Sequence, residues 1–144
     1  MADNIRLMLT QTPLIEGFVK WLHSLSGLAT HRVSQFVSRD ARMRTPDAEA
    51  EGTAAIAAIY KGLFDDTASV VIRVNDRAAG ADGHTVYLRW DRLITCNDGR
   101  KQVLSGITEL MIGTDEKITS IIEHWDRVPE PMVKRSFWAQ LFNR

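Results

Sequence analysis

Three shortages in the composition narrow what this chain can be. The sequence has one cysteine, Cys96, which excludes an intramolecular disulfide and suits a reducing compartment. It has no excess of charge of either sign, because 18 Lys and Arg residues balance 18 Asp and Glu residues. This balance argues against a dedicated nucleic-acid-binding protein, which usually carries a basic excess.

Long apolar runs are also missing. The chain contains no run of about 18 apolar residues, and its first residues, MADNIRLMLTQTP, are too polar for a secretory signal. We therefore expect a cytoplasmic protein with no membrane partner. The chain has 144 residues, of which 44% are hydrophobic, and this is enough for one well-packed domain. We expect that domain to span residues 1–144, with a core of about 13–126.

The first half of the chain has helical periodicity. Thr12 and Pro13 form a cap and a first turn, and apolar residues then recur every three or four positions to a helix end near Gly27. Residues 30–46 predict a second, short helix followed by a short extended piece before Pro46. Residues 51–64 predict a third helix.

The period then changes to two. Residues 69–76, 84–94, 105–112 and 117–126 alternate apolar and polar side chains, and Gly, Asn and Asp fill the links between them. Four strands with short links predict an antiparallel meander, and helices followed by such a sheet predict an α+β fold. A final amphipathic pattern predicts a helix at about 131–143.

Several strings in this order resemble the nuclear transport factor 2-like superfamily, which includes ketosteroid isomerases, SnoaL-like cyclases and scytalone dehydratases. They are EGTAAIAAIY at the third helix, VYLRW on a middle strand, and GITELMIGTDEKITSIIEHWD at the last hairpin. The resemblance implies a cone, in which a curved sheet wraps the helices around a deep pocket.

The resemblance does not extend to the chemistry of the ketosteroid isomerases. Their carboxylate base corresponds to Thr45, and their two oxyanion donors correspond to Trp21 and Thr108. A threonine is no base near neutral pH, so we do not expect isomerase activity. Tyr60 matches a tyrosine that bonds to one of the donors, and we expect it to accept a hydrogen bond from the Trp21 indole or to face a ligand.

The same comparison assigns the strand faces. The face toward the helices is expected to carry Glu123 as its one ionisable acid. A carboxyl among tryptophans is poorly solvated, and with no basic residue expected nearby it becomes the candidate acid or base. The alternative is that Glu123 pairs with an unassigned Arg or Lys, or lies at the wet mouth. The expected ligand pocket consists of Trp21, Thr45, Tyr60, Leu88, Trp90, Thr108, Leu110, Ile121 and Trp125.

The opposite face of the sheet carries charged side chains together with Tyr, Met and Ile. Related folds often dimerise through this face, so we expect a homodimer, with a solvated face as the alternative. Its residues are Arg73, Tyr87, Arg89, Asp91, Glu109, Met111, Ile122, His124 and Asp126.

Two functional hypotheses remain. The first is a protein that binds an apolar small molecule, either without turnover or as a cofactor-independent enzyme for proton transfer, hydration or cyclisation. The second is a non-catalytic interaction or dimerisation module whose pocket is filled by its own side chains. We expect no cofactor and no metal, because the histidines show no metal-ligand spacing with Cys96 or the acids.

Overall fold

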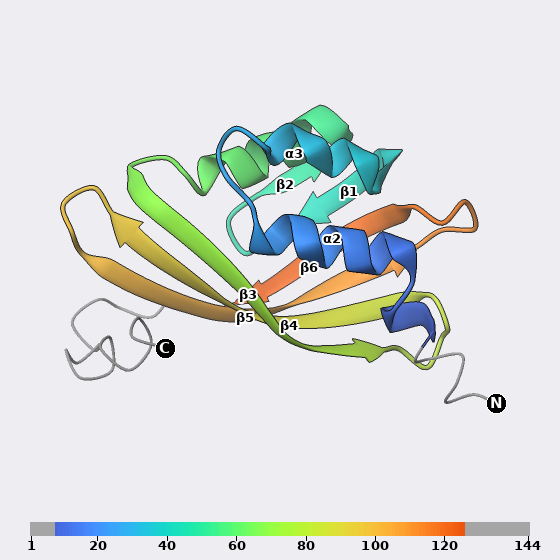
Figure 1. Cartoon of the computed structure of the whole chain (residues 1–144). Helices are drawn as coiled ribbons and strands as arrows, with labels where there is room; N and C mark the ends of the chain where they lie inside the picture. The colour runs from blue at the N-terminus through green and yellow to red at the C-terminus, as the bar shows by residue number, and fades with distance from the viewer. Residues whose placement is uncertain (1–7, 126–144) are drawn as a thin grey trace.

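The structure is a computed structural model that describes residues 8–125 (Figure 1). The helix expected at about 131–143 lies outside the described residues. The described elements are α2 (Pro13–His23), the 3-10 helix η1 (Thr30–Gln35), β1 (Val37–Arg44), β2 (Glu49–Glu51), α3 (Thr53–Gly62), β3 (Thr67–Ala79), β4 (Thr85–Cys96), β5 (Lys101–Ile112) and β6 (Ile118–Trp125).

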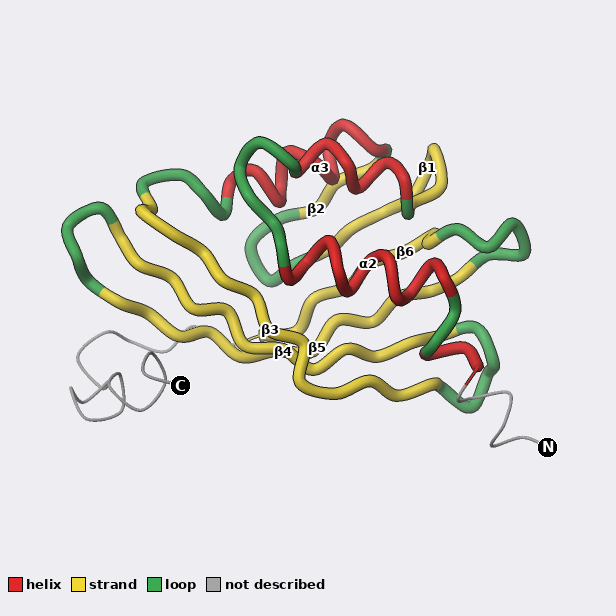
Figure 2. The backbone as a smooth tube through the Cα atoms, in the orientation of Figure 1, coloured by secondary structure: helices red, strands yellow, loops and turns green. Residues whose placement is uncertain are grey.

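The strands form one curved sheet in the order β2-β1-β6-β5-β4-β3. Strands β3 to β6 are an antiparallel meander, as the alternating pattern predicts, and β1 joins the other edge parallel to β6. Both long helices lie on one side of this sheet, and the strands bend around them (Figures 1 and 2). The α+β cone expected from the sequence is therefore confirmed.

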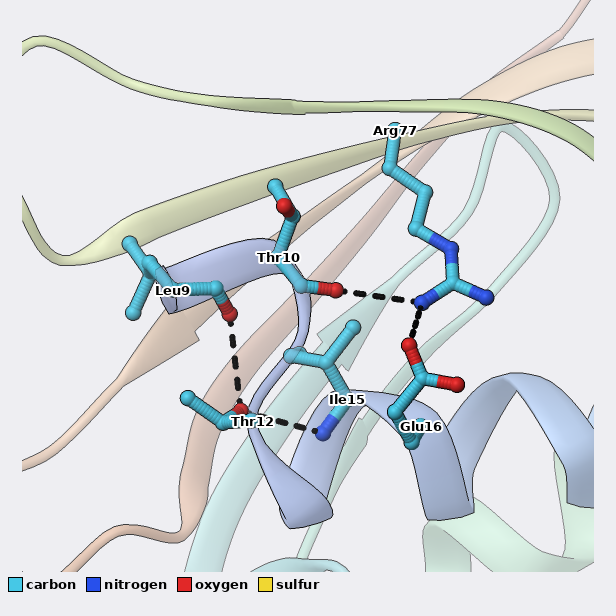
Figure 3. A network of polar contacts seen from close by, with 6 residues as sticks. All are labelled: Leu9, Thr10, Thr12, Ile15, Glu16 and Arg77. Carbon is cyan, nitrogen blue, oxygen red and sulfur yellow. Dashed lines mark hydrogen bonds and ion pairs between the residues drawn. The ribbon is translucent and has the colours of Figure 1, made fainter. Parts of the chain in front are cut away.

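The start of α2 is attached to the sheet by polar contacts (Figure 3). Thr12 caps the helix, since its Oγ1 accepts a hydrogen bond of 3.3 Å from the Ile15 amide. Arg77 on β3 donates from Nη1 to the Thr10 carbonyl at 3.1 Å and pairs with Glu16 in the first turn. These contacts hold the apolar side of α2 against the sheet.

One local expectation, the end of the first helix near Gly27, was wrong, and the short helix and extended piece expected at 30–46 are confirmed. Helix α2 ends at His23, four residues before Gly27. There the Ser24 hydroxyl donates a hydrogen bond of 3.0 Å to the Lys20 carbonyl oxygen, which is one of the acceptors at the helix end. The second helix is a single 3-10 segment, and the short extended piece is the eight-residue strand β1, which forms a hairpin with β2. Every helix within residues 8–125 falls short of the length and hydropathy that a bilayer-spanning helix needs.

Aromatic side chains fill the centre of the cone. Trp21 on α2 meets Phe18 at 5.6 Å and Phe36 at 5.9 Å between ring centroids. It meets Tyr60 on α3 edge to face at 4.9 Å. Edge-to-face pairs at such distances are favourable beyond the apolar area that they bury. This part of the interior is packed core rather than open space.

Candidate functional site

The inner face of the sheet has the phase that the sequence predicts. Five of its expected members are at most 3% exposed, and Glu123 is 8% exposed. Trp125 is partly buried and packs against the core. Those five buried members are Leu88, Trp90, Thr108, Leu110 and Ile121.

The indole of Trp21 is engaged away from Tyr60. Its Nε1 donates to the Ala29 carbonyl at 3.0 Å, so the expected bond from the indole to the Tyr60 hydroxyl is not formed. This first alternative for Tyr60 was wrong because the loop after α2 supplies a backbone acceptor, and the second, that Tyr60 faces a ligand, stays a prediction. Burial raises the pKa of the Tyr60 phenol well above its usual value, the charge of Glu123 adds to this, and Arg92 opposes it. Tyr60 is therefore a neutral phenol within the electrostatic reach of both charged groups.

Thr108 and Thr45 serve local structure. The Thr108 hydroxyl accepts a hydrogen bond of 2.8 Å from Trp90 Nε1 and so fixes the indole ring. Glycine at position 106 leaves room for that ring, because a Cβ there would lie 2.7 Å from Trp90 Cζ2. Thr45 is half-buried, and its hydroxyl accepts from the amides of Asp47 and Ala48 at 3.1 and 3.0 Å, which closes the β1–β2 turn.

Glu123 has a basic partner, which confirms the alternative that it pairs with an Arg or Lys that the sequence alone did not assign. Arg92 Nη2 lies 3.4 Å from Glu123 Oε2, and the two side chains are only 5% and 7% exposed. The expectation of an inner face with no basic residue was therefore wrong. The guanidinium carbon of Arg92 also lies 4.6 Å from the centroid of the Trp90 ring. The site is thus a buried ion pair stacked on an indole.

The signal for Arg92 was present in the sequence. Leu88, Trp90 and Arg92 occupy alternate positions of one strand, and alternate side chains point to the same face. Extending the inward set by one more step places Arg92 beside Trp90. A charged side chain usually lies on the solvated outer face, but the alternation of the strand places Arg92 on the inner face. The opposite charge of Glu123 makes the burial of Arg92 possible.

A cavity of about 720 Å³ opens at one end of the cone. Its lining comes from the end of α3, the end of β4 and the start of β5. The turn between β4 and β5 is at the left of the view in Figure 1. Arg92 is the one fully buried residue among the described residues that line the cavity, so it forms the inner end. The apolar wall consists of Leu63, Ile94, Val103, Leu104 and Trp125, and the acidic residues of the rim are Asp47, Asp65, Asp66 and Asp98.

The expected pocket residues divide into three groups around this cavity. Trp125 lines it directly. Thr45 and Glu123 line a smaller hollow of about 440 Å³, and Trp125 is common to both spaces. The remaining expected residues lie in the packed core. Ile121 is one of them, and it also lines a separate hollow near β1 and β2. The other core residues are Trp21, Tyr60, Leu88, Trp90, Thr108 and Leu110.

The outer face of the sheet exposes several large apolar side chains. Val71, Ile107 and Met111 are 41%, 43% and 45% exposed. His124 pairs with Glu109 on this same face and takes no part in the inner site. Asp126 lies outside the described residues.

A comparison of the sequence with known families decides the classification. The profile of the SnoaL-like domain matches residues 19–121, which is most of the chain. The chain belongs to the SnoaL-like family. No curated protein sequence matches the chain significantly.

Solved structures share the SnoaL-like fold at low sequence identity. An NTF2-like protein of unknown function from Exiguobacterium sp. 255-15 has 14% identity, with a TM-score of 0.68 over 80% of this chain and 99% of that one. A putative SnoaL-like polyketide cyclase from Jannaschia sp. CCS1 has 12% identity, with a TM-score of 0.66 over 80% and 89%. The epoxide hydrolase/cyclase-like enzyme SalBIII has 16% identity, with a TM-score of 0.65 over 88% and 95%. At these identities the likeness shows the SnoaL-like fold alone.

Proposed function

We propose that this protein binds an apolar small molecule in the cavity at the open end of the cone and acts on it without a cofactor. The observation that carries the proposal is the buried pair of Arg92 and Glu123, with Arg92 at the inner end of that cavity. An apolar wall with a few convergent polar groups is the usual composition of a small-molecule site. A carboxylate held in position by a fixed cation meets the geometric requirement of general acid–base catalysis, which is a proton-transferring group at a fixed place.

Glu123 is the proposed acid or base, and Arg92 is its charge partner. Glu123 lines the smaller hollow, which shares Trp125 with the cavity, so a ligand has to extend past Trp125 to reach this carboxylate. The reaction class remains proton transfer, hydration or cyclisation. The SnoaL-like neighbours named as a cyclase and as an epoxide hydrolase/cyclase-like enzyme support a reaction of this kind on this fold. Tyr60 is a neutral phenol within the electrostatic reach of the pair, and it is buried in the core.

Binding in the cavity can be tested with a variant that fills it. Ile94 lines the cavity, so Ile94→Trp should reduce the affinity for a neutral aromatic probe such as naphthalene derivatives by tenfold or more. Val71→Trp is the matched control, because Val71 is on the neighbouring strand and is exposed on the outer face. Equal affinity in the Ile94 variant, measured by calorimetry, would place binding elsewhere and contradict the proposal.

Catalysis needs a separate measurement. A panel of apolar ligands that bind is incubated in deuterium oxide, and exchange of carbon-bound hydrogen is followed by NMR. We expect exchange faster than in buffer, and we expect Glu123→Gln to reduce it by about a hundredfold or more while binding persists. If bound ligands exchange no faster than in buffer, the protein is a binding protein without this proton-transfer activity.

The second candidate is a homodimer or interaction module that uses the outer sheet face. Two observations favour it: the centre of the cone is filled by Trp21, Tyr60 and Trp90, and the outer face exposes Val71, Ile107 and Met111. The two candidates are compatible, because the cavity and the outer face are on different sides of the sheet.

A further inference from the structure

Arg92 carries more hydrogen-bond donors than its surroundings use. A guanidinium has five N–H donors. The polar contact that Arg92 makes among residues 8–125 is the one from Nη2 to Glu123 at 3.4 Å, and its Nε has no partner there. The whole side chain is only 5% exposed, so bulk water reaches little of it. A buried donor without an acceptor is unfavourable, and an acceptor in the cavity would relieve this.

The indole donors of Trp90 and Trp21 are already occupied. Trp90 Nε1 donates to Thr108, and Trp21 Nε1 donates to the Ala29 carbonyl. Arg92 is also held in place, since its guanidinium stacks on a Trp90 ring that Thr108 fixes. A fixed cation with unused donors at the inner end of an apolar cavity is a specific site for an oxygen atom.

The charge around this site disfavours a second anion. The positive charge of Arg92 is already balanced by Glu123, so a ligand carboxylate would lie close to another carboxylate in a poorly solvated place. It would also have to pass a rim with four exposed aspartates and one exposed arginine, which are Asp47, Asp65, Asp66, Asp98 and Arg100. A neutral oxygen acceptor meets neither penalty.

We infer that the ligand of this cavity is a neutral, largely apolar molecule with a hydrogen-bond-accepting oxygen at one end, and that Arg92 binds this oxygen. The inference rests on the proposed function, because it assigns the polar end of the ligand in the same cavity. Arg92 is then the residue that selects the ligand, and Trp90 is the positioning residue that holds the guanidinium.

Three probes of nearly equal shape test the selectivity in the unmodified protein. They are 2-acetylnaphthalene, which has a neutral carbonyl, 2-isopropenylnaphthalene, which has no oxygen, and 2-naphthoate, which is an anion. We expect the ketone to bind about tenfold more tightly than the alkene, because a hydrogen bond to a charged donor is among the stronger ones. The naphthoate should bind more weakly than the ketone by a similar factor.

Variants then assign the preference to Arg92. In Arg92→Met, and in the double variant Arg92→Met/Glu123→Leu that leaves no unpaired charge, the ketone and the alkene should bind equally. Arg89→Met is the matched control, because Arg89 is on the same strand with its side chain 64% exposed and paired with Asp76. It should keep the preference for the ketone. Circular dichroism shows whether each variant is folded.

The outcomes separate the two proposals. If neither the ketone nor the alkene binds the unmodified protein, the cavity is not a site for such ligands, and the proposed function fails together with this inference. If the alkene binds as tightly as the ketone, or the naphthoate binds most tightly, the cavity remains a site but the inference about its ligand is overturned. It is also overturned if a folded Arg92→Met variant keeps the tenfold preference. Should neither Arg92 variant fold, the ranking of the three probes decides.

Discussion

Removing the charge of Glu123 should destabilise this protein, because it would leave Arg92 buried without a counter-ion. The facing atoms of the pair are 3.4 Å apart, and both side chains are at most 7% exposed. With an effective dielectric constant of about 20, two unit charges at this distance attract each other by about 5 kcal/mol. In Glu123→Gln the amide oxygen still accepts a hydrogen bond and the Trp90 ring still faces the cation, so we expect a loss of about 2–4 kcal/mol.

The measurement is urea denaturation at pH 7, followed by circular dichroism and extrapolated to water. A loss of this size is a large part of the 5–15 kcal/mol of total stability that is usual for a folded domain. The single variants Arg92→Met and Glu123→Leu and the double variant Arg92→Met/Glu123→Leu form a double-mutant cycle with the unmodified protein. Because the double variant removes both charges, it should be close to the unmodified protein in stability, or above it.

Two results would refute this reasoning. One is a Glu123→Gln protein that is as stable as the unmodified one, which would mean that Arg92 is adequately solvated without the carboxylate. The other is a double variant that loses as much as the sum of the single variants, which would mean that packing, rather than charge pairing, determines the cost. In either case the ion pair would no longer be a distinct feature of the site.

Three further predictions concern the sheet and its turns. In light scattering we expect the unmodified protein to be a homodimer of about twice 16.2 kDa and the Met111→Glu variant to be a monomer. Leu28→Glu is the control and should stay dimeric, because Leu28 is in a loop and is 91% exposed. An unmodified protein that is monomeric at high concentration would contradict the proposed interface. Asp82→Ala should lower the free energy of unfolding at pH 7 but hardly at pH 2. Hydrogen bonds from the His84 amide and from Thr85 lower the pKa of the Asp82 carboxyl in the folded protein. The stability that this carboxylate contributes is therefore present above its unfolded pKa of 3.8 and is lost as the pH falls through its folded pKa. Equal losses at both pH values would exclude this linkage. Gly106→Ala should lower the free energy of unfolding by about 1–3 kcal/mol in urea denaturation, because the new Cβ would lie 2.6 Å from the His124 carbonyl oxygen and 2.7 Å from Trp90 Cζ2. An unchanged free energy of unfolding would show that the indole can move aside.

The long strands and the two main helices could be predicted because their information is local. Alternation at Val70, Ile72 and Val74, or at Leu88 and Trp90, identifies a strand and its buried face from a few consecutive residues. Thr12 and Pro13 likewise mark a helix start by themselves. In each of these cases the pattern reflects one buried face, and the structure buries that face.

Strand β1 could not be recognised in the same way because its partner is distant in sequence. Four of its eight residues are charged, and its apolar positions, Val37, Ala41 and Met43, are interrupted by a register shift where it pairs with β6. A parallel neighbour about 80 residues away leaves no local periodic signal, and it stabilises a strand that local preference does not favour. The hairpin partner β2 has three residues, which is too short for any period to appear.

The site was harder to predict than the fold because it consists of the few charged residues on an inner face that is otherwise mostly apolar. Strand phase placed Glu123 on the inner face, and the same phase applied to β4 requires Arg92 there as well. What no strand pattern reveals is that the two meet across β5, since β4 and β6 are each paired with β5 and not with each other. The contact between Arg92 and Glu123 determines which ligands the site can bind. A lone inward carboxylate would be a desolvated acid, whereas a carboxylate paired with a guanidinium gives a neutral site with unused donors, and these two sites would select different ligands.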